Sequence, residues 1–227
     1  EPTHLATSVV SMEVYLVNLH TILLRIIMRI LITGKSKLSR YLGDAFKART
    51  GQPVLITHCR FEDEIDWDRH DIFINCAHRE WEQSKMLLRA YEAWRYEPTK
   101  TIINISSRAV QPNISKGYLY AAQKSSLTHL SNNLVYNSDK KCRVSTIHLG
   151  LLERNLKGDP VSLPCLTYND VYEFVSMIAL RKDDVEIPEI TIQHRANYRE
   201  VQDEKELLEE GFLVDDWLGV DPPKTLN

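Results

Sequence analysis

The spacing of hydrophobic and polar positions changes repeatedly along this chain, starting near Met28. Short runs rich in Ile, Val, Leu and Thr alternate with longer stretches in which apolar residues recur every three or four positions. The first pattern predicts buried β-strands and the second predicts amphipathic α-helices. The predicted strands are Arg29–Thr33, Pro53–His58, Asp71–Ala77, Thr101–Ser106, Arg143–Leu149 and Glu189–Gln193. The predicted helices are Leu38–Arg49, Glu80–Arg95, Tyr118–Tyr136 and Asn169–Arg181.

This alternation is typical of βαβ units, in which right-handed crossovers connect parallel strands. Because the strand segments are largely apolar, we expect the sheet to be covered on both faces. The sequence therefore predicts an α/β fold with a doubly wound, mostly parallel Rossmann-type sheet of about six strands and helices on both faces. The acidic connection from His58 to Asp71 leaves little room for a helix and a further strand.

The two ends of the chain depart from this pattern. Residues 1–27 contain an uncharged run, Val14–Leu24, that is too short to span a bilayer, and they lack the basic start of a signal peptide. We interpret them as an N-terminal extension, which can lie outside the natural reading frame; a helix on a membrane surface is the alternative. Residues 196–227 form a mostly acidic C-terminal tail, so the predicted domain spans residues 28–195.

Composition narrows the classes of function. The chain has 227 residues, of which 43% are hydrophobic and 26% are charged, a balance that excludes a disordered or fibrous protein. Its net charge of −3 gives no general attraction to nucleic acid or to acidic membranes. The four cysteines form no CxxC pair, and the eight histidines show no HxxxH spacing. We therefore expect reduced thiols, a cytoplasmic location, and no metal site, nucleic-acid partner or membrane association.

The first candidate site follows the first strand, because ligands of doubly wound sheets bind beyond the carboxyl ends of the strands. The residues there are Gly34, Lys35, Ser36, Lys37 and Leu38. A glycine turn before a helix lets the backbone approach a pyrophosphate, and the two lysines add positive charge. Since only one glycine is present, an ordinary strand-to-helix turn is the competing interpretation.

Arg60 follows the second strand, at the position that meets the adenosine ribose in dinucleotide folds. An arginine there suits a 2′-phosphate, so this residue favours NADP over NAD. A solvated loop arginine is the alternative.

A second candidate site combines Ser107, at the end of a predicted strand, with Tyr120 and Lys124 on the helix that follows. Residues four apart on a helix share one face, so the ammonium lies near the phenol. A nearby positive charge lowers the pKa of a tyrosine, which can then exchange a proton with a carbonyl or alcohol oxygen. Two further Tyr-x-x-x-Lys matches fall outside a continuous helical pattern: Tyr96/Lys100 and Tyr136/Lys140.

From about Arg29 to Gln193, the chain resembles the short-chain dehydrogenase/reductase family. The segment Asp71–Ala77 is similar to the family's strand that ends in Asn-Asn-Ala-Gly, and Ile103–Ser107 is similar to the strand that carries its serine. Arg143–Gly150 resembles the strand that ends in Pro-Gly beside the nicotinamide. Ser107 precedes Tyr120 by 13 residues, the gap usual in compact members of the family.

The resemblance implies an NAD(P)-dependent oxidoreductase that transfers hydride between a nicotinamide and a small carbonyl or alcohol substrate. In this assignment Tyr120 transfers the proton, Ser107 positions the substrate oxygen, and Lys124 also holds the nicotinamide ribose. The family likeness also implies a homodimer or homotetramer. Further cofactor contacts are expected from Asn75, Cys76, Ala77 and Gly150.

The chain departs from the family pattern in several places, and the segment between the second strand and Asp71 is one of them because it is short. The first turn has one glycine where the family has three, and His78 replaces the glycine of Asn-Asn-Ala-Gly. The stretch between Ala77 and Thr101 is short, and no counterpart of the family's catalytic helix asparagine is identified in it. Two alternatives therefore stay open: a nucleotide-sugar reductase or epimerase, and a non-catalytic Rossmann-like binding or regulatory protein.

Overall fold

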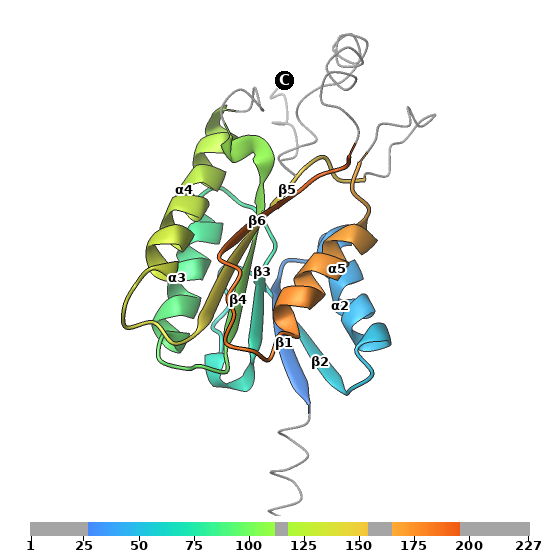
Figure 1. Ribbon diagram of the computed structural model, residues 1–227, viewed down its shortest axis with the longest axis vertical. Coiled ribbons are helices and arrows are strands. Elements are labelled where there is room, and N and C mark those ends of the chain that lie inside the picture. The colour runs from blue at the N-terminus through green and yellow to red at the C-terminus, as the bar shows by residue number, and fades with distance from the viewer. Residues whose placement is uncertain (1–26, 112–117, 154–164, 196–227) are drawn as a thin grey trace, which may run out of the picture.

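The computed structural model describes residues 27–111, 118–153 and 165–195. Within these residues, six parallel strands form one sheet in the order β2-β1-β3-β4-β5-β6 (Figure 1). The strands are β1 (Met28–Thr33), β2 (Val54–Cys59), β3 (Ile72–Asn75), β4 (Thr101–Ser107), β5 (Arg143–Leu149) and β6 (Glu189–Ile192). The helices are α2 (Lys37–Arg49), α3 (Glu82–Trp94), α4 (Tyr118–Val135) and α5 (Tyr168–Ala179), with single 3₁₀ turns η1 (Trp67–Arg69) and η2 (Arg108–Val110).

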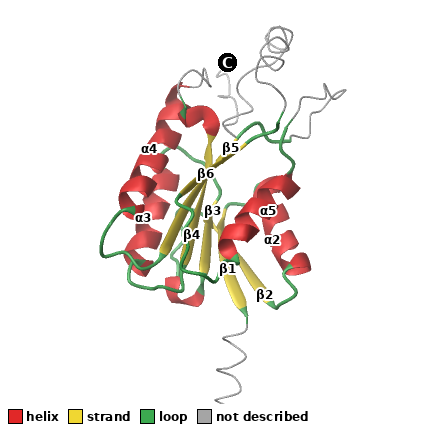
Figure 2. Cartoon of the chain, viewed as in Figure 1, coloured by secondary structure: helices red, strands yellow, loops and turns green. Residues whose placement is uncertain are grey.

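Helices cover both faces of the sheet, α3 and α4 on one side and α2 and α5 on the other (Figures 1 and 2). Each face buries its own apolar cluster because side chains of successive strand residues point to opposite faces. In β1, Ile30 and Ile32 contact the cluster under α2 and α5, whereas Leu31 contacts the cluster under α3 and α4. The predicted doubly wound α/β fold is confirmed.

β3 is shorter than the sequence pattern predicts. The predicted strand runs to Ala77, but β3 ends at Asn75. The backbone N–H groups of Cys76 and Ala77 donate to the Thr33 hydroxyl, at 2.8 and 2.9 Å. Because these donors are satisfied by a side chain at the end of β1, the chain leaves the sheet without losing hydrogen bonds.

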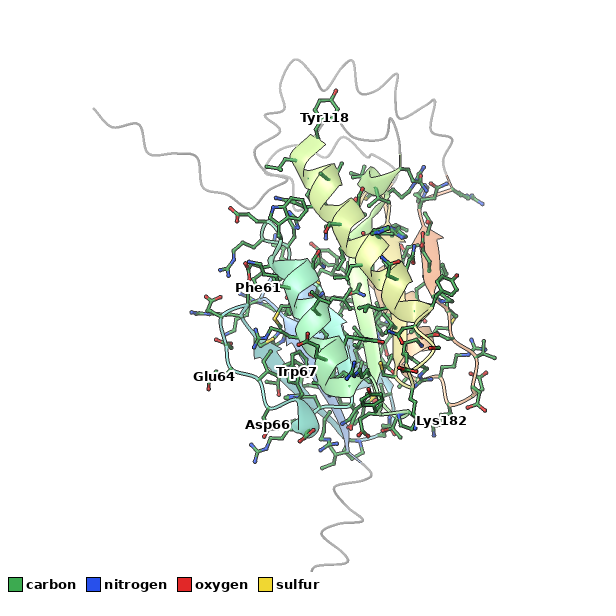
Figure 3. All side chains as sticks on the ribbon, turned by 90° about the vertical axis from the view of Figure 1, so that its left-hand side faces the viewer. Phe61, Glu64, Asp66, Trp67, Tyr118 and Lys182 are labelled. Carbon is green, nitrogen blue, oxygen red and sulfur yellow. The ribbon has the colours of Figure 1, made fainter. Side chains whose placement is uncertain are left out.

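The connection between β2 and β3 contains η1 and no further strand, as its length predicts. The Trp67 ring packs edge-on against Phe73 and Trp94, with centroids 5.3 and 5.6 Å apart. Arg89 of α3 donates to the main-chain oxygen atoms of Phe61 and Asp63, each at 2.9 Å. Figure 3 shows Phe61 and Trp67 alongside α3. These contacts fix the connection against the body of the domain.

Candidate active site

The strand order reverses between β1 and β3, because β1 pairs with β2 on one side and with β3 on the other. Chains that leave the two strands in opposite directions open a crevice at their carboxyl ends, which is where ligands bind in this class of sheet. The predicted site residues lie at or after the ends of β1, β2, β3, β4 and β5, or on α4. The fold therefore brings them to one edge of the sheet.

Gly34 forms a turn that only a residue without a side chain fits. Its φ angle is 77°, in the left-handed region. A Cβ atom added to Gly34 would lie 2.8 Å from the Cβ of Ala77, closer than van der Waals contact allows. The ends of β1 and β3 therefore meet at Gly34 and Ala77, which brings two of the predicted cofactor residues together.

Helix α2 starts directly behind this turn. Ser36 is its N-cap, and the Ser36 hydroxyl accepts from the backbone N–H of Ser39 at 3.2 Å. Lys35 and Lys37 are exposed on either side of the cap, and the first helical turn has no acidic residue. Leu38 is buried in the core instead, so it anchors the helix. The positive end of the helix dipole and the two lysines make this turn attractive to an anion.

Ser107 is the last residue of β4 and is buried. Its hydroxyl accepts from the backbone N–H of Ala109 at 3.1 Å and so caps η2. A hydroxyl can still donate while it accepts one bond. Ser107 can therefore give a hydrogen bond to an oxygen placed at the carboxyl edge of the sheet.

Tyr120 and Lys124 lie one turn apart on α4, as the spacing predicts. The Lys124 Nζ atom is 5.8 Å from the centroid of the Tyr120 ring. Lys124 is only 4% exposed, and burial lowers the pKa of its ammonium to about 8, while the nearby Cys76 acts in the opposite direction. At pH 7 the ammonium is therefore still mostly protonated beside the tyrosine ring.

Gln83 and a main-chain carbonyl hold this lysine, and two asparagines lie behind Gln83. The sequence pattern gave no reason to select Gln83 or Asn104. Lys124 Nζ donates to Gln83 Oε1 at 2.7 Å and to the main-chain oxygen of Ile105 at 3.1 Å. Asn75 Nδ2 donates to the main-chain oxygen of Gln83 at 2.8 Å and to Asn104 Oδ1 at 3.1 Å. Asn75 has no exposed surface, so its side chain supports the site from behind.

His78 lies where the family that the sequence resembles has a glycine, and it contacts Tyr120, the residue expected to transfer the proton. Its ring packs edge-on against Tyr120, with centroids 4.9 Å apart. Burial lowers the pKa of His78 to about 4, and the charge of Lys124 lowers it further, against a hydrogen bond with Gln123. His78 is therefore neutral at pH 7.

Cys76 joins the two parts of the site. Burial raises the pKa of its thiol to about 11, while the charge of Lys124 and a hydrogen bond with Ser36 oppose that rise. The thiol is thus close to both the α2 cap and the α4 lysine. It stays protonated at neutral pH, so it is not a nucleophile there.

Arg60 and Gly150 lie at the two flanks of this edge. Arg60 is exposed directly after β2, and its backbone N–H donates to Asp63 Oδ2 at 2.8 Å. Gly150 follows β5, and its N–H donates to the main-chain oxygen of Ile192 at 2.8 Å. A Cβ at Gly150 would lie 3.0 Å from the Cβ of Gln193, so this glycine lets the end of β5 lie close to the residue after β6.

Metal ligands do not gather at this edge or elsewhere in the described ranges. Within them, no group of three or more His, Cys, Asp or Glu residues is arranged to hold a metal ion. None of the helices described is long and apolar enough to cross a membrane. All four cysteines are free thiols.

Comparison with known proteins gives matches in structure only. No family model matches the sequence, and no curated protein matches it. Serine dehydrogenase from Escherichia coli is similar with a TM-score of 0.56 and 17% identity, over 75% of this chain and 99% of that chain. Alcohol dehydrogenase from the archaeon Thermococcus sibiricus, solved with 5-hydroxy-NADP, has a TM-score of 0.56 and 14% identity, over 75% of this chain and 98% of that one.

A short-chain dehydrogenase/reductase from Vibrio parahaemolyticus has a TM-score of 0.52 and 14% identity, over 72% of this chain and 98% of that chain. These matches and the strand order agree with the resemblance found in the sequence. The chain therefore has the Rossmann-type fold of the short-chain dehydrogenases/reductases.

Proposed function

We propose that this protein is a short-chain dehydrogenase/reductase that transfers hydride between NADP and a small carbonyl or alcohol substrate. The observation that carries the proposal is the juxtaposition of Lys124 and Tyr120 on α4, behind the strand that ends in Ser107. Tyrosine and lysine at this spacing occur often by chance. A buried lysine beside the tyrosine ring, at the carboxyl edge of a Rossmann-type sheet, is a far more specific arrangement.

Each of the three residues has a distinct role in this proposal. The Lys124 ammonium would stabilise the ionised form of Tyr120, as a positive charge beside a phenol does. Tyr120 gives its proton to a carbonyl oxygen in reduction and takes it back in oxidation. Ser107 donates a hydrogen bond to the same oxygen and fixes its position. NADPH, when bound, supplies the hydride.

The residues at the β1–α2 turn fit a dinucleotide. Gly34 has a left-handed φ and lies close to Ala77, so the turn between β1 and α2 carries no side chain at this position. Ser36, Lys35 and Lys37 would hold the pyrophosphate through the helix end and two positive charges. Arg60 would meet a 2′-phosphate, which supports NADP over NAD. Arg60 is exposed, so its guanidinium is accessible to a phosphate.

Assembly and location are part of the proposal. The family likeness supports a homodimer or homotetramer. The free thiols support a reducing compartment such as the cytoplasm. Residues 28–195 form the oxidoreductase domain in this interpretation, while the extension and the tail lie mostly outside the described residues.

A non-catalytic binding or regulatory protein is the second candidate. Two observations favour it: the Lys124 ammonium already has two internal acceptors, and the Tyr120 ring already packs against His78. Such contacts are also what a purely structural tyrosine and lysine would make. The distinction depends on whether a dinucleotide binds and reacts.

The test is a titration of NADPH and NADH into the purified full chain, followed by nicotinamide fluorescence. We expect saturable binding with NADPH tighter than NADH. Substitution Gly34→Val serves as the comparison, because a branched side chain at this φ fills the turn beside Ala77 and should remove binding. No saturation by either cofactor at millimolar concentration would sink the oxidoreductase proposal. Bound NADPH should then be oxidised by small aldehydes or ketones.

A further inference from the structure

Gln83 lies in the first turn of α3 and is 2% exposed. Its amide touches three elements: the end of β3, the end of β4 and the middle of α4. The Nδ2 atom of Asn75 donates to the main-chain oxygen of Gln83, which ties this turn of the helix to the end of β3. The position of the Gln83 side chain is therefore set from both ends.

The early end of β3 explains why a glutamine is needed there. Asn75, the last residue of β3, pairs in register with Asn104, so β4 continues beyond it without a strand on that side. Gln83 Nε2 donates to the main-chain oxygen atoms of Asn75 and Ile105, at 2.7 and 2.9 Å. The amide thus satisfies carbonyl groups that a longer β3 would otherwise serve, in a region where unpaired groups are costly.

These two bonds also decide which way the amide faces. Both carbonyls accept only, so the NH₂ group must point toward them and Oε1 must point away. Oε1 lies 2.7 Å from Lys124 Nζ, which can only donate. The three contacts are therefore consistent with a single orientation of the Gln83 amide.

As a result, the hydrogen-bond acceptors around the Lys124 ammonium are uncharged. Its two acceptors are the Gln83 amide oxygen and the Ile105 carbonyl, and within the described ranges no carboxylate lies within ion-pair distance. An amide oxygen stabilises an ammonium less than a carboxylate does. The lysine is held in place without being neutralised, so its charge remains available to the tyrosine ring 5.8 Å away.

We propose that Gln83 is the positioning residue for proton transfer: it fixes the Lys124 ammonium beside Tyr120 through a neutral acceptor, using the carbonyl groups at the ends of β3 and β4 as its own anchor. This proposal rests on the proposed oxidoreductase function. In this role Gln83 acts through Lys124, which its amide oxygen contacts directly.

The test compares two substitutions that both disturb the amide but act on Lys124 in opposite directions. Gln83→Met removes the acceptor, which should lower the pKa of Lys124 by about one unit. Gln83→Glu places a carboxylate beside the ammonium, which should raise that pKa by about one unit or more. Both variants lose the two bonds to main-chain carbonyls, so both are expected to be less stable than wild type. If both variants are destabilised but shift the pKa of Lys124 in opposite directions, a merely structural role for Gln83 is excluded.

The pKa is measured by NMR of ¹³Cε-labelled lysine, with the Lys124 signal assigned through Lys124→Arg. Met86→Ala is the matched control, because Met86 is similarly buried on α3 but packs in the apolar cluster. It should lower stability and leave the titration of Lys124 unchanged. A Lys124 pKa that is the same in wild type and both Gln83 variants overturns the proposal.

A measurement on wild type covers the case in which neither variant folds. The side-chain amide ¹⁵N signal of Gln83 should shift with the same midpoint as the Lys124 signal, since the two groups share a hydrogen bond. A Gln83 amide that does not follow the titration of Lys124 also overturns the proposal.

A kinetic measurement links the hydrogen bond between Gln83 and Lys124 to the proposed reaction. In carbonyl reduction, the basic limb of the pH–rate profile should move down by about one unit in Gln83→Met and up in Gln83→Glu, with turnover reduced about tenfold or more in the former. An unchanged profile in folded, cofactor-binding variants refutes the role in proton transfer. Failure of wild type to bind NADPH refutes the proposed function, and the NMR comparison still decides whether Gln83 positions the lysine.

Discussion

The two halves of the candidate site are built in different ways. On the α3 and α4 side, Lys124, Gln83, Asn75 and Asn104 are buried and hydrogen-bonded to one another and to the ends of β3 and β4. On the α2 side, Lys35, Lys37 and Arg60 are exposed, and the turn depends on the backbone of Gly34. The half proposed for proton transfer is therefore positioned by hydrogen bonds within the protein, whereas the half proposed for the cofactor offers backbone groups and charges on long, exposed side chains.

This difference has a physical consequence. Buried polar groups that satisfy one another specify a single geometry, which proton transfer requires. Exposed lysine and arginine side chains must be ordered by the ligand, which costs binding free energy. We therefore expect changes in the first half to affect turnover or stability strongly, and changes in the second half to affect mainly cofactor affinity.

The largest effect is expected from Tyr120→Phe. Removing the hydroxyl removes the proposed proton donor, so turnover should fall by about 10²- to 10⁴-fold while NADPH affinity changes little. Steady-state kinetics and a fluorescence titration measure the two quantities. Tyr136→Phe is the matched control, because this exposed tyrosine belongs to another Tyr-x-x-x-Lys sequence and should keep full activity. Equal turnover in Tyr120→Phe and wild type would show that Tyr120 is not the proton donor and that this half of the site does not set the rate.

The second effect concerns stability and the buried charge of Lys124. Its pKa is about 8 in the folded protein, against 10.5 for a lysine in water, so the unfolded chain binds more protons between these values. Stability should therefore rise with pH through this window, as the folded protein sheds a poorly solvated charge. Relative to Lys124→Met, wild type should gain about 2 to 3 kcal/mol between pH 7 and pH 10.

Denaturant unfolding at several pH values provides the measurement. The comparison with Lys124→Met removes contributions from other groups, such as the buried Cys59 and Cys76 thiols, whose raised pKa values act in the opposite direction. Lys182→Met, at an exposed lysine, should track wild type at every pH. A constant difference between wild type and Lys124→Met would mean that Lys124 is not a buried charge.

The third effect tests the turn that supports the cofactor half. Gly34→Ala combines a positive φ with a Cβ contact of 2.8 Å to Ala77, so it should destabilise the protein by roughly 1 to 3 kcal/mol and weaken NADPH binding. Gly51→Ala is the matched control, because Gly51 also has a positive φ but open space around it. It should cost about 1 kcal/mol and leave cofactor affinity intact. Equal losses of stability and of NADPH affinity in the two variants would show that the contact between Gly34 and Ala77 has no special role.

The smallest effect is expected for Arg60→Ala, which tests the preference for NADP over NAD. Arg60→Ala should weaken NADPH binding about tenfold and leave NADH binding nearly unchanged, because only NADPH carries the 2′-phosphate. Arg69→Ala removes another exposed arginine of the same connection and should alter neither affinity. If Arg60→Ala weakens both cofactors equally, its charge acts on the dinucleotide as a whole and the preference for NADP has no support.

Much of the fold could be predicted from local pattern. The β-branched runs gave all six strands to within a few residues, and the Tyr-x-x-x-Lys spacing put Tyr120 and Lys124 on one face of a helix. The end of β3 was missed, since it depends on the Thr33 hydroxyl 43 residues away from Cys76. Gln83 was missed for the same reason, because its partners Ile105 and Lys124 lie 22 and 41 residues away in the chain.

The sequence by itself determined the periodicity of the strands and helices, the parallel doubly wound sheet, and the residue types at the strand ends. These follow from interactions between near neighbours, which apolar spacing and turn residues record directly. Only the tertiary structure decided how Lys124 is buried, which amide holds it, and that Gly34 meets Ala77. Burial and hydrogen bonding between distant segments have no local signature, because they depend on which strand ends the folded sheet brings side by side.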